Sequence, residues 1–354
     1  RAAIGIAIAN VRRFHEAQTM PPVSVETAPG VVCERVSKPL ESVGLYVPAG
    51  TAPLPSTAIM LGVPSAIAGC PVRVLCTPPR PDGLADPAVV VAARACGVRD
   101  IFKAGGAQAI AAMAYGTATV PKVVKIFGPG NAWVTAAKAI VAADPAGAAL
   151  DMPAGPSEVM VVADARADAR FVALDLLSQA EHGPDSHVVL LALDPGLLAR
   201  VEVEIDKALG GLSRRTTIEQ ALEHSVALVV TNRDDAVAVA NAYAPEHLIV
   251  QVADPRAFAA GLTTSGSVFL GRWTPESVGD YCSGTNHVLP TYGYARAYSG
   301  LSVADFQRRM TLQEVTLTGL RGLAPTVRTL AGLEGLDAHA LAVTVRLNAA
   351  DTRP

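Results

Sequence analysis

The feature of this chain that most constrains its fold is an alternation of short β-rich runs with alanine-rich segments of helical length. The β-rich runs occupy residues 43–48, 72–79, 100–106, 124–130, 158–164, 187–194, 227–232, 247–252 and 267–271. Strands spaced in this way, with helices between them, are typical of parallel βαβ units that are covered on both faces. We therefore predict an α/β fold with two doubly wound parallel-sheet domains.

The two ends of the chain depart from this pattern. A helical stretch is followed by a proline-rich, extended segment, and we expect residues 1–41 to pack on the second series of strands. Towards the other end the pattern is helical at 304–316, 324–336 and 338–350. Helices with apolar faces at this period often dock on another surface, so we predict a helical C-terminal tail that contacts a symmetric partner subunit.

Composition limits the partners. The 354 residues carry a net charge of -3 and include no basic run that would favour nucleic acid or an acidic membrane. Prolines at 48, 53, 55, 64 and 71 interrupt the uncharged stretch 42–72, which argues against a single membrane-spanning helix. The five cysteines are odd in number and form no CxxC pair, so reduced thiols are the simplest interpretation. We predict a cytoplasmic protein with a small-molecule partner.

Side chains that can bind a metal gather in two short polar segments, around Gln179 and around Asp280. Gln179 and His182 are three residues apart, a spacing that on a helix directs both side chains to one face. With Asp280 and His339 they supply an amide oxygen, a carboxylate and two imidazoles, a set suited to zinc or its first-row neighbours. Each residue alone also has a structural explanation. Charged neighbours favour a metal at His182, whereas His339 stands alone in the sequence.

Glu246 and His247 lie between a proline turn and the β-rich run that follows. An adjacent acid and imidazole could serve there as a general base and a proton relay, because both titrate near neutral pH once partly buried. The alternative is a solvated turn in which Glu246 caps the backbone and His247 faces water. The spacing leaves both interpretations open.

Glycines cluster just after predicted strands: a Gly-Gly pair precedes Gln108, and further glycines lie in 127–131 and 151–157. Glycine lets the backbone approach a phosphate, and a helix that begins near Ala132 would favour its negative charge. These features favour a nucleotide. The dinucleotide fingerprint is incomplete, because GPGNAW has Trp133 where the third glycine should be. We therefore predict incomplete Rossmann-like domains that would bind a dinucleotide in an atypical manner.

These segments together resemble the histidinol dehydrogenase family between residues 31 and 348. The motifs that carry the resemblance are VGLYVPAG, GGAQAIAA, KIFGPGNAWVTAAK, DMPAGPSEV, DLLSQAEHGPDS, PEHLIVQ, GSVFLG, ESVGDYCSGTNHVLPT and ADFQRRMT. So many long matches in the same order make the resemblance specific.

The resemblance implies a role for each matching residue. The ligands of one zinc ion per subunit would be Gln179, His182, Asp280 and His339. The catalytic pair would be Glu246 and His247. The contacts to NAD would be Tyr46, Gln108 and Asn131. The substrate would touch the zinc-binding residues and His247, together with Ser157, His287 and Glu334.

The implied reaction is a four-electron oxidation of L-histidinol to L-histidine through the aldehyde, the last steps of histidine biosynthesis. Two NAD+ would be reduced in turn while zinc orients the substrate. His247 would take the alcohol proton, and Glu246 would activate water for attack on the aldehyde. The resemblance also implies a homodimer in which the residues corresponding to Glu334 and His339 complete the neighbour's active site.

These expected ligands divide the chain into three predicted regions. We predict a zinc- and substrate-binding domain from residues 1–45 and 159–300, an NAD-binding-like domain from 46–158, and a helical dimerisation segment from 301–354. The chain opens with Arg1 rather than Met, and we expect part of the natural N-terminus to precede it.

Two other functions compete with this reading. A zinc hydrolase would use Glu246 or Glu181 with a metal-bound water, but it would leave the glycine-rich motifs without a role. A non-catalytic binding or assembly protein would keep the fold for its dimer surface, and it would tolerate the loss of Glu246 and His247.

Overall fold

The computed structural model describes residues 1–49 and 52–351, so Gly50, the last residue of the VGLYVPAG motif, lies outside the described residues. Contacts divide the chain into two compact units. The two units are Arg1–Gln18 with Leu40–Phe306, and Thr19–Pro39 with the chain from Gln307 onward.

The first unit contains two five-stranded sheets, and the strands of each are parallel. Across the first sheet the strands are β5 (Asp100–Phe102), β4 (Val72–Cys76), β3 (Ser42–Tyr46), β6 (Lys125–Phe127) and β7 (Ala149–Leu150). The helices of this half are α2 (Pro55–Ile67), α3 (Pro87–Ala95), α4 (Gly106–Tyr115) and α5 (Ala132–Ala143). Every residue of the central strand β3 is buried, as expected of a strand that is covered on both faces.

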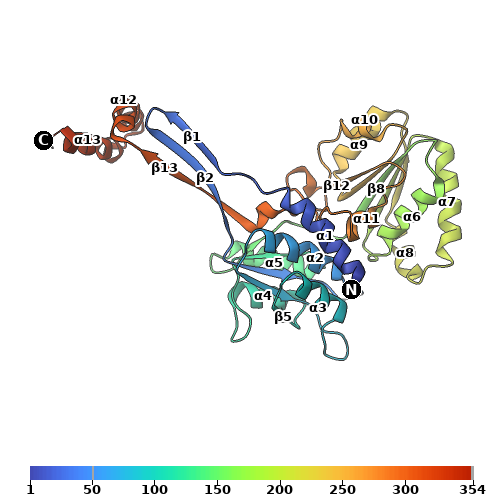
Figure 1. Ribbon diagram of the computed structural model, residues 1–354. Helices are drawn as coiled ribbons and strands as arrows, with labels where there is room; N and C mark the ends of the chain where they lie inside the picture. Colours follow the sequence, from blue (N-terminus) through green and yellow to red (C-terminus); the bar gives the residue numbers. More distant parts are fainter. Residues whose placement is uncertain (50–51, 352–354) are drawn as a thin grey trace. The chain divides into compact units, whose positions relative to one another are not determined.

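The second sheet repeats this architecture. Across it the strands are β10 (Val226–Val229), β9 (His187–Ala192), β8 (Glu158–Ala163), β11 (His247–Gln251) and β12 (Ser267–Leu270). Its helices are α6 (Ala169–Ala180), α7 (Pro195–Leu209), α8 (Arg215–Leu222), α9 (Arg233–Tyr243) and α10 (Pro255–Ala259). Val159 and Val161 of β8 pack with α6, α7 and α8, whereas Met160 and Val162 pack with α9 and α10. The two sets of helices cover opposite faces of the sheet (Figure 1).

Both sheets have the same strand order. If the strands of each sheet are numbered by their position in the sequence, the order across the sheet is third, second, first, fourth, fifth. This is the doubly wound order. The first strand lies in the middle of the sheet, the second and third are added on one side of it, and the fourth and fifth are added on the other. The predicted α/β fold with two parallel-sheet domains is confirmed, and each predicted β-rich run overlaps an observed strand.

The N-terminal helix α1 (Ala2–Glu16) contacts both halves of the first unit. It packs against α2, and its Asn10 donates a hydrogen bond to the carbonyl of Cys282. The extended segment that follows belongs to the second unit. Residues 1–41 therefore do not pack as one body on the second series of strands, because α1 packs mainly against α2 and the core of the first sheet, whereas residues 19–39 belong to the second unit. The remaining helices of the first unit are α11 (Glu276–Tyr281), η1 (Tyr294–Arg296) and η2 (Val303–Phe306).

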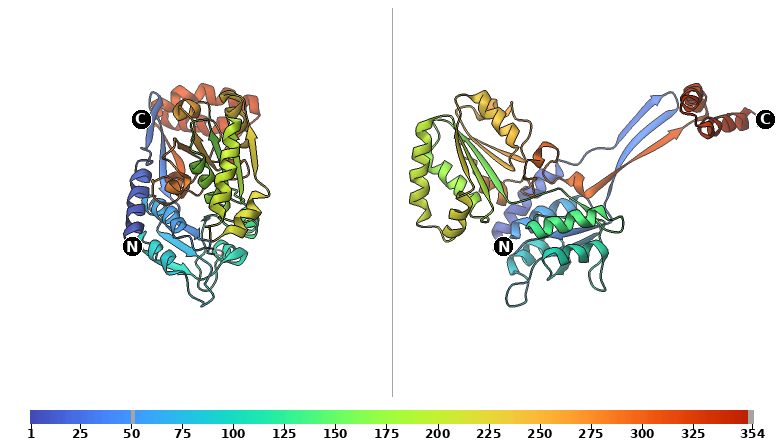
Figure 2. Two further views of the ribbon diagram at one scale, coloured as in Figure 1. Left: turned by 90° about the vertical axis from the view of Figure 1, so that its right-hand side faces the viewer. Right: turned by 180° about the vertical axis from the view of Figure 1, so that it is seen from behind.

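The second unit is an antiparallel sheet with two helices (Figure 2). Its elements are β1 (Val23–Ala28), β2 (Val31–Pro39), β13 (Gln307–Val315), α12 (Leu317–Glu334) and α13 (Asp337–Asp351). The helical prediction for 304–316 is wrong, because this segment is η2 followed by β13. β13 pairs residue by residue with β2, from Gln307 opposite Pro39 to Val315 opposite Val31, and this distant pairing overrides the local preference. The predicted helical tail is confirmed beyond residue 316.

The compact units are defined by contacts, whereas the predicted domains are defined by the ligands that each would bind. The domain boundaries therefore stay predictions. Within the part of the chain that the structure describes, no helix has both the length and the hydropathy that crossing a membrane requires. All five cysteines are free thiols.

Candidate functional site

Polar side chains collect where the strands of the second sheet begin. Glu158 is the first residue of β8 and His247 the first of β11, and His247 lies opposite Val159 in the register. The helix that follows a parallel strand runs back along the sheet, so the last turn of α6 returns to this same end. We call this region the polar edge, and it consists of Gln179, His182, Glu246, His247, Glu276 and Asp280.

The acid–imidazole pair is buried, since Glu246 is 6% exposed and His247 is 4% exposed. This excludes the solvated turn. Glu246 Oε2 accepts a hydrogen bond from the backbone N–H of Glu158 at 3.0 Å. His247 Nδ1 lies 3.6 Å from Glu246 Oε2 and 3.7 Å from Glu276 Oε1, and its Nε2 lies 3.6 Å from Asp280 Oδ1. One imidazole therefore faces three carboxylates.

This arrangement shifts the protonation of the polar edge. Burial alone would lower the pKa of His247, but the charges of Glu276 and Glu246 and the contact with Asp280 raise it well above its ordinary value. Burial and the charges of Asp280 and Glu246 raise the pKa of Glu276 to about 8, although the charge of His247 opposes the shift. For Asp280, burial acts upward, but the contact with His247 and the nearby histidine charges bring its pKa below the ordinary value.

Three side chains of the polar edge can hold a metal ion together. One donor atom from each of His182, Glu276 and Asp280 lies within 4.8 Å of the other two. The sequence reasoning named His182 and Asp280 but missed Glu276. The signal was present, because Glu276 and Asp280 are four residues apart on α11 and so share a helix face.

Gln179 is fully buried beside this cluster, on the last turn of α6. The hydrogen-bond network orients its amide so that the nitrogen faces Glu276 and donates to both carboxylate oxygens, with 3.1 Å to Oε2. The amide oxygen is thereby left for another partner. His182 lies beyond the end of α6, in the turn where its N–H donates to the carbonyl of Gln179. Only Gln179 is thus on the helix that the spacing suggested.

The predicted substrate contacts are divided between the two units. Ser157 directly precedes β8 and is partly buried. His287 Nε2 is buried without a hydrogen-bond partner, as is His247 Nε2, and burial lowers the pKa of His287. Glu334 ends α12 and His339 lies on α13, where both are exposed in the second unit.

The predicted NAD contacts lie in the first sheet, at the end where its strands finish, whereas the polar edge lies where the strands of the second sheet begin. Tyr46 ends β3, and its buried hydroxyl accepts a hydrogen bond from the N–H of Gly106 at 3.0 Å. Asn131 is the N-cap of α5, where its Oδ1 accepts from the N–H of Val134, and Gln108 is exposed on α4. We call this region the glycine edge, and it consists of Tyr46, Gly106, Gln108, Gly128 and Asn131.

A buried ion pair fixes the glycine edge. Gly128 has φ +119°, and a Cβ there would meet the carbonyl oxygen of Tyr46, so only glycine fits. Asp151 Oδ2 accepts from the N–H of Gly128 at 2.8 Å, and Lys138 Nζ donates to the carbonyl of Gly128 at 2.9 Å. Lys138 and Asp151 also pair with each other. Asp151 begins the segment 151–157, which leads directly to Glu158.

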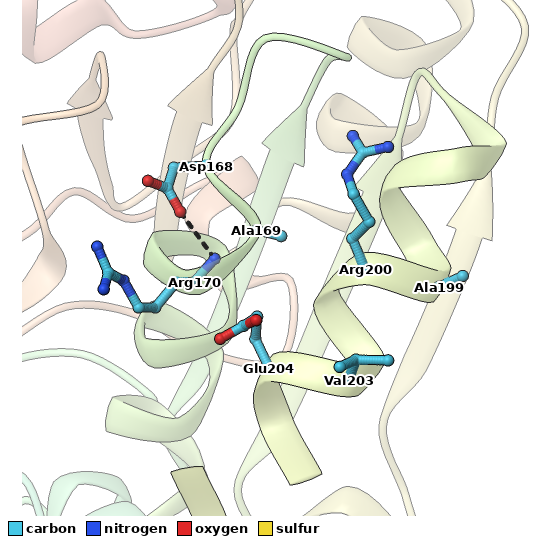
Figure 3. A pocket seen from close by; sticks show the side chains of 7 residues that line it. All are labelled: Asp168, Ala169, Arg170, Ala199, Arg200, Val203 and Glu204. Carbon is cyan, nitrogen blue, oxygen red and sulfur yellow. Dashed lines mark hydrogen bonds between the residues drawn. The ribbon is translucent and has the colours of Figure 1, made fainter. Parts of the chain in front are cut away.

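A surface depression of about 580 Å³ lies elsewhere, at the start of α6 (Figure 3). The residues that line it are Asp168, Ala169, Arg170, Ala199, Arg200, Val203 and Glu204. Three of its four charged side chains already have partners, because Asp168 caps α6, Arg200 faces Asp194 and Glu204 pairs with Lys207. The polar edge, at the other end of α6, is the better candidate site.

The fold and the two edges together define an α/β enzyme. Two doubly wound sheets carry a buried acid–imidazole pair and a cluster that can hold a metal, and they also carry a glycine-rich edge suited to a nucleotide. This combination goes beyond what a non-catalytic assembly protein needs.

Comparison with known proteins identifies the family. The family model for histidinol dehydrogenase matches residues 1–347. Histidinol dehydrogenase of Vibrio cholerae is 57% identical over 98% of this chain and 80% of its own length, and that of Xanthomonas euvesicatoria is 58% identical over 99% and 81%. The crystal structure of histidinol dehydrogenase from Elizabethkingia anophelis matches with a TM-score of 0.96 and 47% identity, over 99% of this chain and 81% of that one. The chain belongs to the histidinol dehydrogenase family, a family of oxidoreductases.

Proposed function

We propose that this protein oxidises L-histidinol to L-histidine through the aldehyde, with NAD+ as the oxidant and zinc orienting the substrate. Membership of the family supports the substrate and the overall reaction. The observation that carries the proposal is the buried His247, which faces Glu246, Glu276 and Asp280 beside a cluster that can hold a metal.

The donor set of the polar edge fits zinc. Gln179, His182 and Asp280 would hold the ion with His339, and the amide orientation of Gln179 leaves its oxygen for this purpose. The C-terminal end of α6 also carries a partial negative charge that favours a cation. When bound, Zn²⁺ would supply a fixed positive charge that orients the imidazole and amino nitrogens of the substrate. Glu276 would then serve to hold the Gln179 amide in place.

The glycine edge fits a dinucleotide. Gln108 and Asn131 are exposed there, and the backbone N–H groups at the N-terminus of α5 would favour a phosphate. Tyr46 would act by holding the Gly106 loop in place, because its hydroxyl is already engaged with that loop. When bound, NAD+ would supply the acceptor for the hydride.

The remaining chemistry belongs to this chain's own residues. His247, in its neutral form, takes the proton of the substrate hydroxyl in the first oxidation, and the carboxylates around it stabilise the imidazolium that results. The positive charge of a zinc ion on Asp280 would offset these carboxylates and so favour the neutral form before the reaction. In the second stage Glu246 takes a proton from water while the water oxygen adds to the aldehyde carbon, and protonated His247 returns its proton to the former carbonyl oxygen, which gives the hydrate. Neutral His247 then takes a hydroxyl proton of the hydrate as the carbon loses its hydride, and the water oxygen stays in the new carboxyl group. Ser157 and His287 would bind the substrate at the same end of the sheet.

The test is the amount of NADH formed per L-histidinol consumed by the zinc-loaded protein. We expect two NADH for each substrate molecule, since conversion of an alcohol to an acid removes four electrons. The His247→Asn variant serves as the control and should form almost none. If the wild-type protein with zinc forms no NADH, the zinc hydrolase becomes the better account.

We further propose a homodimer in which Glu334 and His339 of one chain complete the site of the other. Large apolar side chains support a covered surface on the second unit, because Leu330, Leu333, Leu336 and Leu341 are exposed. No residue of α13 is buried. The free cysteines support a cytoplasmic location, which we also propose.

Two inactive variants can test the exchange of residues between subunits. His247→Asn and His339→Asn are co-expressed with different tags, and the mixed dimer is purified. If His339 acts across the interface, one site of the mixed dimer has both histidines intact, and activity returns. If His339 acts within its own chain, each site carries one defect, and the mixed dimer stays inactive. The His339→Asn protein alone should also lose zinc and activity together.

A further inference from the structure

A series of buried and partly buried hydrogen bonds begins at the acid–imidazole pair and leads to Tyr243 and His187. Glu158 Oε1 accepts from the backbone N–H of Glu246 at 3.3 Å, and Oε2 accepts from the hydroxyl of Tyr243 at 3.2 Å. The same Tyr243 oxygen lies 2.6 Å from Nδ1 of His187. Because the Tyr243 proton is given to Glu158, His187 must be the donor at the other end.

Backbone groups also take part in this series of hydrogen bonds. The N–H of Glu158 donates to Glu246 Oε2 while the N–H of Glu246 donates back to Glu158, so the two glutamates bind each other reciprocally. The carbonyl of Glu158 lies 3.4 Å from Nδ1 of His247. Ala244 has φ 57° and reverses the backbone between Tyr243 and Glu246, which brings both to the same carboxylate.

We propose that Glu158, held by Tyr243 and His187, is the positioning residue that sets the orientation of Glu246 and His247 for catalysis. This inference rests on the proposed function, because it assigns Glu158 to the reaction that those two residues carry out. Glu158 itself touches neither the metal cluster nor the glycine edge in any recorded hydrogen bond or ion pair among the described residues.

The charge of Glu158 matters to this role. An ionised carboxylate accepts on both oxygens, whereas a protonated one becomes a donor at one of them. Protonation therefore places two donors, Glu158 and His187, on the Tyr243 oxygen and leaves the Tyr243 hydroxyl proton without its acceptor, and it loosens the turn that carries the pair. Burial and the charge of Glu246 raise the pKa of Glu158 to about 7, so this change falls within the working range. The groups that face Glu158 are Glu246, His247, Tyr243, the backbone of Tyr292 and, through Tyr243, His187.

The first test removes one hydroxyl. In the full-length, zinc-loaded protein, Tyr243→Phe should lower kcat about 3- to 10-fold at neutral pH, with zinc content and the KM for histidinol nearly unchanged. The acid limb of the kcat profile should move to higher pH, because the lost hydrogen bond stabilised the ionised Glu158. Tyr115→Phe is the matched control, since Tyr115 donates to Asp144 at 2.8 Å in the first half and should leave kcat unchanged.

The second test changes Glu158 itself. Glu158→Gln keeps an oxygen for the Glu246 N–H and a donor for the Tyr243 oxygen, but it cannot titrate, so its kcat should fall while the acid limb due to Glu158 disappears. Glu158→Ala should lose more kcat than Glu158→Gln. If Tyr243→Phe and Glu158→Gln lower kcat by a constant factor at every pH, or not at all, the positioning role is refuted. Should the Glu158 variants fail to fold, Tyr243→Phe alone decides.

A readout without turnover separates this inference from the proposed function. The Glu246 amide should be protected from hydrogen exchange in the wild-type protein, and Tyr243→Phe should accelerate its exchange by about 3- to 10-fold. A wild-type protein that forms no NADH from histidinol contradicts the proposed function. Equal exchange in wild type and Tyr243→Phe contradicts the hydrogen-bond chain, whatever the activity.

Discussion

The two sheets of the first unit share one strand order but present their candidate functional residues at opposite ends. In the first sheet these residues follow the strands, and they consist mainly of glycines, a helix N-cap and backbone N–H groups. In the second sheet they gather at the end where the strands begin, and they are mainly carboxylates and imidazoles. Topology therefore does not decide what an edge can bind. The local supply of backbone donors or of charged side chains does.

The two edges also differ in whether a buried carboxylate has a cationic partner. Asp151 beside the glycine edge is neutralised by Lys138 and accepts backbone N–H groups. Near the polar edge, burial raises the pKa of Asp175 and of Glu158 to about 7, and neither has a Lys or Arg partner among the ion pairs of the described residues. Uncompensated acids of this kind are costly, and they are common where a protein prepares a site for a cation or a proton transfer.

The largest expected effect comes from the polar edge. His247→Asn should lower kcat by about 10²- to 10⁴-fold, because it removes the group that accepts the proton, while zinc content and substrate affinity change little. Steady-state kinetics with metal analysis checks this. A variant that keeps a tenth of the wild-type kcat would show that His247 is not the base.

A change of intermediate size is expected in the free energy of unfolding when Asp175, which lies in the half with the second sheet, is replaced. Asp175 is buried with one hydrogen bond, from Gln251 Nε2 at 2.7 Å, and its folded pKa lies above the ordinary value of 3.8. The folded state therefore binds more protons than the unfolded state between about pH 4 and 7, so this group lowers stability progressively as pH rises through that window. Asp175→Asn should raise the free energy of unfolding by about 1–3 kcal/mol at pH 8, and the gain should vanish near pH 4. Urea unfolding at both pH values measures this, and an equal gain at both would refute the explanation.

The smallest expected effect compares two matched helix caps. Asn131 caps α5 at the glycine edge, and Asn232 caps α9 in the other half, each accepting from the N–H three residues on. Either change to Ala should cost about 1 kcal/mol of stability. Only Asn131→Ala should also raise the KM for NAD+, by a few fold, because only that side chain borders the proposed dinucleotide. Equal KM values for the two variants would remove Asn131 from the cofactor site.

The sequence predicted the strands well because the strands of both sheets are short, mainly apolar and separated by helices, which is a local signal. It did not predict the two-residue strand β7, nor β13, whose partner β2 lies at the other end of the chain. Composition cannot reveal such pairing.

The candidate site was predicted only where its residues are close in sequence. Glu246 and His247 are adjacent in sequence, so their joint role could be proposed before the fold, but their burial could not. Glu158 and Tyr243 were missed because only the pairing of β8 with β11 and the reversal at Ala244 bring them together. A lone acid at the start of the otherwise apolar strand EVMVVA was the one available hint.

The segment 151–157 is attached at both ends and in its middle. Asp151 holds Gly128, the N–H of Gly155 donates to Thr291, and the carbonyl of Ser157 accepts from His187. Loops on a protein surface usually tolerate changes in length. This segment differs, because its hydrogen bonds fix the distance between its two ends. Adding or removing a single residue there would shift the spacing between the glycine edge and the polar edge, whereas the same change in the loop 79–87 would leave it intact.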